Sequence, residues 1–257
     1  MFTFDHVSGK HLSTGDAHIY YELTGSEGQP ALLLLHGGFG TIEDFNSLIP
    51  ELGQKYRIVG IDSRGHGKSA LGSGRLTYRQ LQKDAEQVLS HLHINSLSII
   101  GFSDGGVVAY RLAAQSSLNI EKLVTIGADW HYKNTEPVRE LFLNITPESL
   151  KQKFPESYAA YQKLNPEPDF EAFTEAVKGM WLDAGPSGYP NETVEKIACP
   201  LLIVRGDEDH LFPAKAAAGL SELVPGSKLL NIPFAGHVAF EDQKAPFMKS
   251  LKEFLKF

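Results

Sequence analysis

The sequence contains almost no cysteine and no long apolar stretch, and both shortages narrow the class of protein. Its 257 residues include a single cysteine, Cys199, so no disulfide can form within the chain. Such sparing use of cysteine is typical of a reducing compartment. The longest uninterrupted apolar run, Ala31–Leu35, is far shorter than the roughly 20 residues needed to cross a membrane. Met1–His6 lacks the basic and then apolar pattern of a signal peptide. We therefore expect a cytoplasmic protein that does not interact with a membrane.

Clusters of basic residues are also missing. The chain has 24 lysines and arginines against 31 aspartates and glutamates, which gives a formal net charge of −7, and it has no basic run. Binding to nucleic-acid phosphates needs clustered Lys and Arg, so a nucleic-acid partner is not expected. With 42% hydrophobic and 21% charged residues the composition is that of an ordinary globular protein, long enough for one α/β domain.

Short apolar runs alternate along most of the chain with segments of helical periodicity. The run Leu32–Leu35 has no polar alternation, as expected of a parallel strand covered on both faces. In Tyr78–Leu92 apolar residues recur at helical spacing, and Thr77 can cap this helix. The alternation predicts an α/β fold with a mostly parallel sheet flanked by helices. The predicted strands are His18–Leu23, Ala31–His36, Arg57–Ile61, Leu97–Gly101, Leu123–Ile126, Leu201–Arg205 and Lys228–Ile232, and further helices are predicted at Val107–Gln115, Ala214–Leu223 and Ala245–Leu255.

The alternation breaks between residues 129 and 195, where no strand pattern occurs. The candidate helices there begin at residues typical of helix starts, such as Pro147 and the potential N-cap Asp169. We interpret residues 129–195 as a helical lid inserted over the edge of the sheet, with residues 1–128 and 196–257 forming the core. The alternative is that these helices pack on the back of the sheet.

A lone serine stands between glycines at the end of an apolar run. The pentapeptide Gly101-Phe102-Ser103-Asp104-Gly105 matches G-x-S-x-G, with a predicted strand before it and a helix after it. Asp209 lies in a carboxylate-rich turn after the next-to-last predicted strand, and His237 follows the last one. Because the carboxyl ends of parallel strands meet at one edge of a sheet, we expect the three side chains to converge.

Three further motifs complete a resemblance to the α/β-hydrolases. His36–Gly40 resembles the oxyanion loop of that family, Asp62–Ser69 its D-x-R-G-x-G-x-S turn, and Gly236-His237 its catalytic-histidine loop. The resemblance covers nearly the whole chain apart from the block 129–195, which lies where relatives carry a helical cap. It is nearest to the small capped serine hydrolases: esterases, haloperoxidase-like enzymes and C–C bond hydrolases, which use no cofactor.

The resemblance implies a catalytic triad. Ser103 would be the nucleophile and His237 the base that takes its proton, since a serine hydroxyl is a weak nucleophile near neutral pH. The family motif G-x-x-D-x-x-x-P ends at Pro213 and makes Asp209 the triad acid, which holds the imidazole in the correct tautomer. Asp129 remains an alternative acid, because some relatives carry the acid after the preceding strand.

The same resemblance suggests the surroundings of the triad. The backbone N–H groups of Gly38 and Asp104 would bind the oxyanion. Phe39, Trp130 and Trp181 are expected to line the substrate pocket, although aromatic residues of a lid also pack with one another to form its own core.

Neither a metal nor another cofactor is expected. Gly67-Lys68-Ser69 is similar to the end of a phosphate-binding P-loop, but the required earlier glycine is replaced by Asp62. The acidic stretch Asp207–His210 lacks the spacing of a calcium loop.

The predicted function is hydrolysis of a small-molecule ester or related carbonyl compound through a Ser-His-Asp triad and an acyl-enzyme. C–C bond hydrolysis or perhydrolysis by the same triad is an alternative. A second alternative is a non-catalytic ligand-binding or signalling protein of the same fold. No motif specifies the substrate or the oligomeric state.

Overall fold

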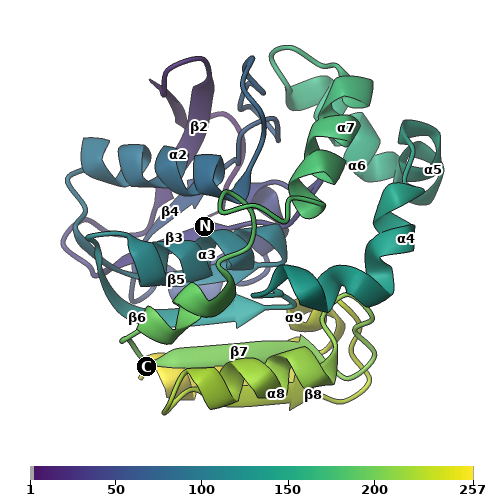
Figure 1. The fold of residues 1–257 in the computed structure, drawn as a ribbon. Coiled ribbons are helices and arrows are strands. Elements are labelled where there is room, and N and C mark those ends of the chain that lie inside the picture. The colour runs from purple at the N-terminus through teal and green to yellow at the C-terminus, as the bar shows by residue number, and fades with distance from the viewer. Residues whose placement is uncertain (1–2, 257) are drawn as a thin grey trace.

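A mostly parallel sheet forms the centre of the molecule (Figure 1). The computed structural model describes residues 3–256. Over that range the sheet has eight strands in the order β1-β2-β4-β3-β5-β6-β7-β8, of which β2 runs antiparallel to both its neighbours while all other pairs are parallel. This confirms the predicted fold class. The strands are β1 (Lys10–Ser13), β2 (His18–Thr24), β3 (Ala31–Leu35), β4 (Arg57–Ile61), β5 (Ser96–Phe102), β6 (Asn119–Ile126), β7 (Leu201–Gly206) and β8 (Lys228–Ile232).

All of the predicted strands are present, and β1 is the one that was not predicted. β1 is a short edge strand of sequence Lys-His-Leu-Ser that pairs with β2. A strand without apolar alternation leaves no periodic signal in the sequence. β6 begins at Asn119 instead of Leu123, because three of its first four residues are polar and none of the four is fully buried.

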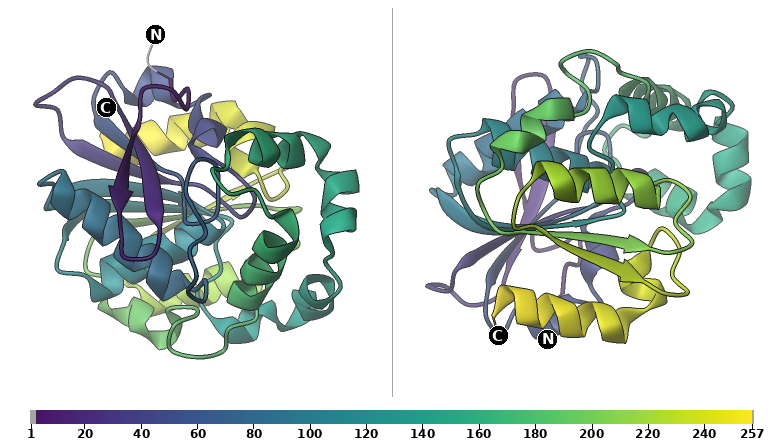
Figure 2. Two further views of the ribbon diagram at one scale, coloured as in Figure 1. Left: turned by 90° about the horizontal axis from the view of Figure 1, so that it is seen from above. Right: turned by 60° about the horizontal axis from the view of Figure 1, so that its bottom comes forward.

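Helices cover both faces of the sheet (Figure 2). Leu33 and Leu35 of β3 belong to a hydrophobic cluster that includes residues of α2, α3 and α8, whereas Leu32 and Leu34 belong to a second cluster that includes residues of α1, α9 and α10 on the opposite face. Burial on both faces explains why this strand shows no polar alternation. Within residues 3–256, no helix combines the length and the apolar character needed to cross a membrane. The helices are η1 (Ile42–Phe45), α1 (Ile49–Leu52), α2 (Tyr78–His91), α3 (Asp104–Gln115), α8 (Ala214–Leu223), α9 (Ala239–Asp242) and α10 (Lys244–Leu255).

Between β6 and β7 the chain forms helices and loops only. In Figure 1 the helices α4 to α7 stand beside one end of the sheet, outside the layers that cover its faces. Asn165, between α6 and α7, ties this segment to the turn after β4, because its Nδ2 donates to the carbonyls of Gly65, Gly67 and Ser69 at 3.0–3.2 Å. The division into a core and a cap stays a prediction. The elements of the segment are η2 (Tyr132–Val138), α4 (Arg139–Leu143), α5 (Pro147–Lys153), α6 (Pro155–Leu164), α7 (Phe170–Trp181) and η3 (Asn191–Lys196).

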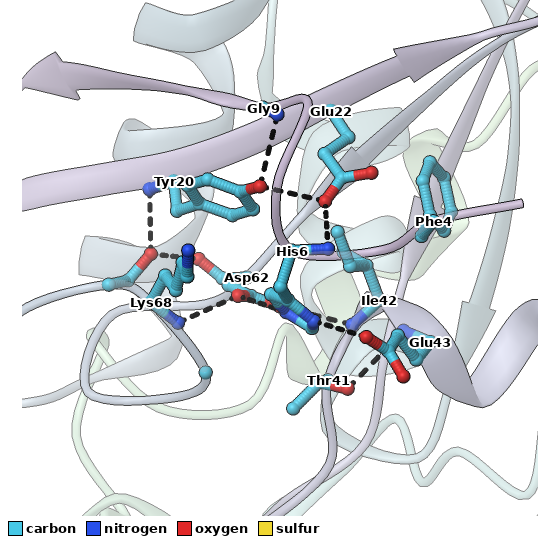
Figure 3. Close-up of polar contacts among 12 residues, drawn as sticks. Phe4, His6, Gly9, Tyr20, Glu22, Thr41, Ile42, Glu43, Asp62 and Lys68 are labelled. Atoms are coloured by element: carbon cyan, nitrogen blue, oxygen red, sulfur yellow. Dashed lines mark hydrogen bonds and ion pairs between the residues drawn. The ribbon is translucent and has the colours of Figure 1, made fainter. Parts of the chain in front are cut away.

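A group of polar side chains fastens the N-terminal segment to the sheet (Figure 3). We refer to His6, Tyr20, Glu22, Glu43 and Asp62 as the N-terminal cluster. The His6 ring contacts Glu43 through Nδ1 at 2.6 Å and Asp62 through Nε2 at 2.8 Å. Glu22 accepts hydrogen bonds from the His6 backbone N–H and the Tyr20 hydroxyl, both at 2.7 Å.

The charge of His6 follows from these contacts. Burial lowers the pKa of His6, but the hydrogen bonds and negative charges of Asp62 and Glu43 outweigh burial and raise the pKa to about 9. His6 is therefore a cation at neutral pH, held between two carboxylates. Asp62 also accepts hydrogen bonds from the backbone N–H groups of Ile42 and Lys68, so the cluster joins four separate segments of the chain.

Candidate active site

Ser103 lies in the sharp turn that joins β5 to α3. Its backbone has φ 50° and ψ −117°, a conformation that is costly for a residue with a side chain. Glycines on both sides make the turn possible: a Cβ on Gly101 would lie 2.5 Å from the Gly105 carbonyl oxygen, and a Cβ on Gly105 would overlap the Leu35 carbonyl. The turn leaves the Ser103 hydroxyl at its apex. A strained residue held by its surroundings is typical of a functional site.

Ser103, His237 and Asp209 form one chain of hydrogen bonds. His237 Nε2 lies 3.0 Å from Ser103 Oγ, and His237 Nδ1 lies 3.0 Å from each carboxylate oxygen of Asp209. The three residues follow β5, β8 and β7, respectively, so the carboxyl ends of three parallel strands supply the side chains, with β6 between β5 and β7. The structure thus brings together the three residues that the sequence nominates for the triad.

The turn after β7 holds Asp209 in this orientation. Asp209 Oδ1 accepts hydrogen bonds from the backbone N–H groups of Leu211 at 2.9 Å and Phe212 at 3.1 Å. The buried guanidinium of Arg205 donates to the carbonyls of Phe212 at 3.1 Å and Asp209 at 3.3 Å. A fixed carboxylate beside Nδ1 favours the imidazole tautomer with its proton on that nitrogen, which leaves His237 Nε2 able to accept the proton of Ser103.

Asp129, the alternative triad acid, has other partners. Its Oδ1 accepts hydrogen bonds from the backbone N–H groups of Trp130 at 2.7 Å and His131 at 3.3 Å and from Asn134 Nδ2 at 2.8 Å. Its Oδ2 is buried and has no hydrogen-bond partner among the described residues. Burial raises the pKa of Asp129 to about 6, against the effect of these hydrogen bonds. In the described structure, therefore, His237 is oriented by Asp209 and not by Asp129.

The two predicted oxyanion donors lie close to the serine. A Cβ on Gly37 would lie 3.1 Å from Ser103 Cβ, and a Cβ on Gly38 would lie 2.7 Å from Asp104 Oδ2, so the loop after β3 runs against the start of α3. Within residues 3–256, neither the Gly38 N–H nor the Asp104 N–H donates to an acceptor of the chain. Both amides are thus free to bind a developing negative charge, and the N-terminus of the 12-residue helix α3 adds its partial positive charge.

A cavity of about 60 Å³ borders Ser103 and His237, and we refer to it as the catalytic cavity. Its wall contains no lysine or arginine. The carboxylates of Asp104 and Asp129 belong to this wall. Aromatic residues form much of the remainder: Tyr78, Phe142, Trp181 and Tyr189.

The side chain of Asp104 is a feature that the sequence did not reveal. The Tyr78 hydroxyl donates to Asp104 Oδ1 at 2.7 Å, and Trp181 Nε1 donates to Oδ1 and Oδ2 at 2.8 and 2.9 Å. Burial raises the pKa of Asp104, and the hydrogen bonds from Trp181 and Tyr78 oppose that rise. An acidic residue in the first turn of a helix is common, so nothing in the motif indicated that this carboxylate lies in the cavity.

The predicted pocket residues have three different positions. Trp181, at the end of α7, lines the catalytic cavity. Phe39 packs edge-on against Trp181 with ring centroids 5.9 Å apart, and it lines a second cavity of about 250 Å³ between the loop after β3 and helices α6 and α7. Trp130 lines neither of these two cavities, and its place in the substrate pocket stays a prediction. A buried indole N–H requires an acceptor, and Trp130 Nε1 finds it in the Ala216 carbonyl of α8 at 2.9 Å.

Comparisons with known proteins match this chain to α/β-hydrolases. A family model described as alpha/beta hydrolase fold matches residues 30–185. The human "Serine hydrolase BPHL" is 27% identical to this chain, over 97% of this chain and 87% of its own length. The 2-hydroxy-6-oxo-6-(2'-aminophenyl)hexa-2,4-dienoic acid hydrolase of Metapseudomonas resinovorans is 24% identical, over 91% of this chain and 86% of its own. The crystal structure of the enol-lactonase from Burkholderia xenovorans is similar with a TM-score of 0.76 at 19% identity, covering 96% of this chain and 100% of that one.

Proposed function

The chain belongs to the α/β-hydrolase family, and we propose that it is a serine hydrolase that cleaves an ester or related carbonyl substrate through an acyl-enzyme. Its fold and its relatives indicate a hydrolase. The observation that carries the finer proposal is the 3.0 Å distance between Ser103 Oγ and His237 Nε2, with Asp209 bound to the other ring nitrogen.

Each group has one task in the proposed reaction. His237 Nε2 takes the proton of Ser103 while Oγ attacks the substrate carbonyl, and Asp209 stabilises the imidazolium that forms. The N–H groups of Gly38 and Asp104 bind the oxyanion, and such a donor is typically worth about 2.7–4 kcal/mol of transition-state stabilisation. His237 then protonates the leaving group, and water activated by His237 releases the acid from Ser103.

The helical segment 129–195 is proposed to act as a cap that excludes water and selects a small-molecule substrate. The hydrogen bonds from Trp181 to Asp104, the residue after the nucleophile, support this role. So does the contact of Phe39 with Trp181, because it joins the oxyanion loop to α7. A cytoplasmic location stays a prediction.

C–C bond hydrolysis is the second candidate, because the same triad serves it. The 24% identity to the dienoic acid hydrolase supports this candidate. A panel of p-nitrophenyl esters of increasing chain length, assayed beside a dienol-type diketone, distinguishes the two reactions. Turnover of the esters alone supports the esterase, whereas a higher kcat/KM for the diketone supports the C–C hydrolase.

A fluorophosphonate probe tests the nucleophile directly. We expect one label on the wild type, no label on Ser103→Ala, and strongly reduced labelling of His237→Ala. Ser90→Ala is the matched control, because Ser90 is an exposed serine of α2 and its loss should leave labelling unchanged. Labelling of folded Ser103→Ala, or none on the folded wild type, would contradict the proposal, and the latter would favour a ligand-binding protein.

A further inference from the structure

Two buried carboxylates of the catalytic cavity differ in how their oxygens are hydrogen-bonded. Asp104 and Asp129 are 6% and 7% exposed. Both oxygens of Asp104 accept hydrogen bonds, from Tyr78 and Trp181. All donors to Asp129 are bound to Oδ1, whereas Oδ2 has no partner among the described residues. Native proteins rarely leave a buried carboxylate oxygen without a donor, so this exception calls for an explanation.

The position of Asp129 suggests one. Asp129 follows β6 and lies in the wall that also contains Ser103 and His237. Two residues earlier, a Cβ on Gly127 would lie 3.0 Å from His237 Nδ1 and 3.1 Å from Asp209 Oδ2, so this loop runs along the pair that orients the base. An acceptor at Asp129 is therefore close to the place where the substrate carbonyl would react.

No described residue donates a hydrogen bond to this oxygen. The Tyr78 hydroxyl and the Trp181 indole N–H are already bound to Asp104, and no lysine or arginine lines the wall. The cavity is small, at about 60 Å³, so a substrate group that reaches Asp129 also lies near Ser103 and His237. We therefore expect the donor that reaches Asp129 to lie on the acyl chain close to the carbonyl that Ser103 would attack.

We propose that Asp129 is a specificity-determining residue whose Oδ2 accepts a hydrogen bond from a hydroxyl or ammonium group on a short acyl chain. The proposal rests on the proposed function, because it takes Ser103 to attack the carbonyl of that acyl group. An ionised carboxylate is an acceptor only, and its hydrogen bonds to a donor are charge-assisted. Because burial raises the pKa of Asp129 to about 6, the carboxylate is ionised in assays at pH 8.

Asp129→Asn tests this inference. The amide keeps an acceptor for the donors that now bind Oδ1, but it replaces Oδ2 by an NH2 group, which is a donor. The substrates are the ethyl esters of butyric acid and of its 2-hydroxy, 3-hydroxy, 2-amino and 3-amino derivatives. Comparing wild type with variant on each ester cancels differences in the chemical reactivity of the esters. Asp207→Asn is the control, because it removes the same charge from an exposed side chain of the neighbouring turn.

We expect Asp129→Asn to lower kcat/KM roughly 10- to 150-fold for the hydroxy esters, the amino esters or both, and less than about threefold for ethyl butyrate. The hydroxy and amino arms tell which donor the site accepts. An equal loss on every ester would make Asp129 a structural residue, and no loss on any would also contradict the inference. If Ser103 is still labelled by a fluorophosphonate in either case, only this inference fails. Absent labelling and absent turnover by the wild type would overturn the proposed function and this inference with it.

A measurement on the wild type covers the case in which Asp129→Asn does not fold. Butyramide and its 2-hydroxy and 2-amino derivatives cannot be hydrolysed as readily as esters and serve as inhibitors. At least one donor-bearing amide should inhibit about tenfold more strongly than butyramide. Equal inhibition by all three amides would overturn the inference.

Discussion

The N-terminal cluster and the catalytic cavity both bury ionisable side chains, but the two regions differ in how completely these side chains are hydrogen-bonded. In the cluster, both ring nitrogens of His6 and both carboxylate oxygens of Glu22 and Asp62 have partners. In the catalytic cavity, Asp129 Oδ2 has none among residues 3–256. A satisfied buried network rigidifies the fold, whereas an unsatisfied group lowers stability and persists where it binds something else. We infer that the cluster contributes mainly to stability and the cavity mainly to function.

The sharpest test of this contrast is Ser103→Ala. We expect kcat to fall by roughly four to six orders of magnitude, because the members of a triad act as a unit. The free energy of unfolding should change by less than about 1 kcal/mol, since the hydroxyl has a single hydrogen-bond partner, His237. Ester hydrolysis and urea unfolding of the same preparations give both numbers. A variant that unfolds would show that Ser103 is needed for stability. A variant that keeps its activity would show that Ser103 is not the nucleophile.

His6→Ala tests the opposite region. Removing the imidazole leaves Asp62, whose side chain is fully buried, without its cation, so we expect a loss of about 3–5 kcal/mol in the free energy of unfolding. The folded variant should keep kcat within about threefold of the wild type at 25 °C. Val7→Ala is the control, because Val7 is 82% exposed and its truncation should cost less than about 0.5 kcal/mol. A large loss of kcat with unchanged stability would reverse the assignment of the two regions.

The two regions could not be predicted equally well from the sequence. The proposed catalytic residues follow apolar strands, and the rule that parallel strands end at one edge was enough to bring Ser103, Asp209 and His237 together. His6 has no such signal. Its partners Glu43 and Asp62 lie 37 and 56 residues away, and neither periodicity nor spacing connects them. Long-range polar contacts of this kind follow from the tertiary fold, so the sequence gives no local indication of them.

The two tryptophans of the helical segment show the same limit of prediction from the sequence. Both Trp130 and Trp181 are large, partly polar side chains next to predicted helices, and composition alone does not tell which one borders the substrate. The choice depends on which acceptor each indole N–H reaches: Ala216 of α8 for Trp130 and Asp104 for Trp181. Those acceptors are 86 and 77 residues away, beyond the range of local patterns.

Replacing each tryptophan by alanine separates their roles. Trp181→Ala enlarges the catalytic cavity, so we expect the ratio of kcat/KM for short and long p-nitrophenyl esters to change by roughly 10- to 200-fold. Trp130→Ala, the matched control, should lower the melting temperature and leave that ratio unchanged. If Trp181→Ala lowers activity equally on all esters, its side chain supports the cap and does not select the acyl chain.

The pH dependence of stability gives the smallest expected effect. One titration of the free energy of unfolding reports on both regions, because His6 and Asp129 titrate in different pH windows. The folded-state pKa of His6 is raised from 6.5 to about 9, so the stability that its charge contributes is complete below pH 6.5 and is lost as the pH rises towards 9. The loss is smaller than that of His6→Ala, because a neutral imidazole still donates one hydrogen bond.

The pKa of Asp129 is raised from 3.8 to about 6, so its ionisation also lowers stability, but in the separate window between pH 3.8 and 6. We therefore expect His6→Gln to reduce the fall in the free energy of unfolding as the pH rises from 6.5 to 9, and to leave the slope between pH 3.8 and 6 unchanged. Asp129→Asn should reduce the fall as the pH rises from 3.8 to 6, because an amide has no charge to bury, while Asp104, whose pKa burial also raises, still contributes to it. Urea unfolding of the wild type and both variants from pH 4 to 9 measures the two slopes. If both variants alter the same window, the satisfied cluster and the unsatisfied cavity are coupled, and the division between stability and function does not hold.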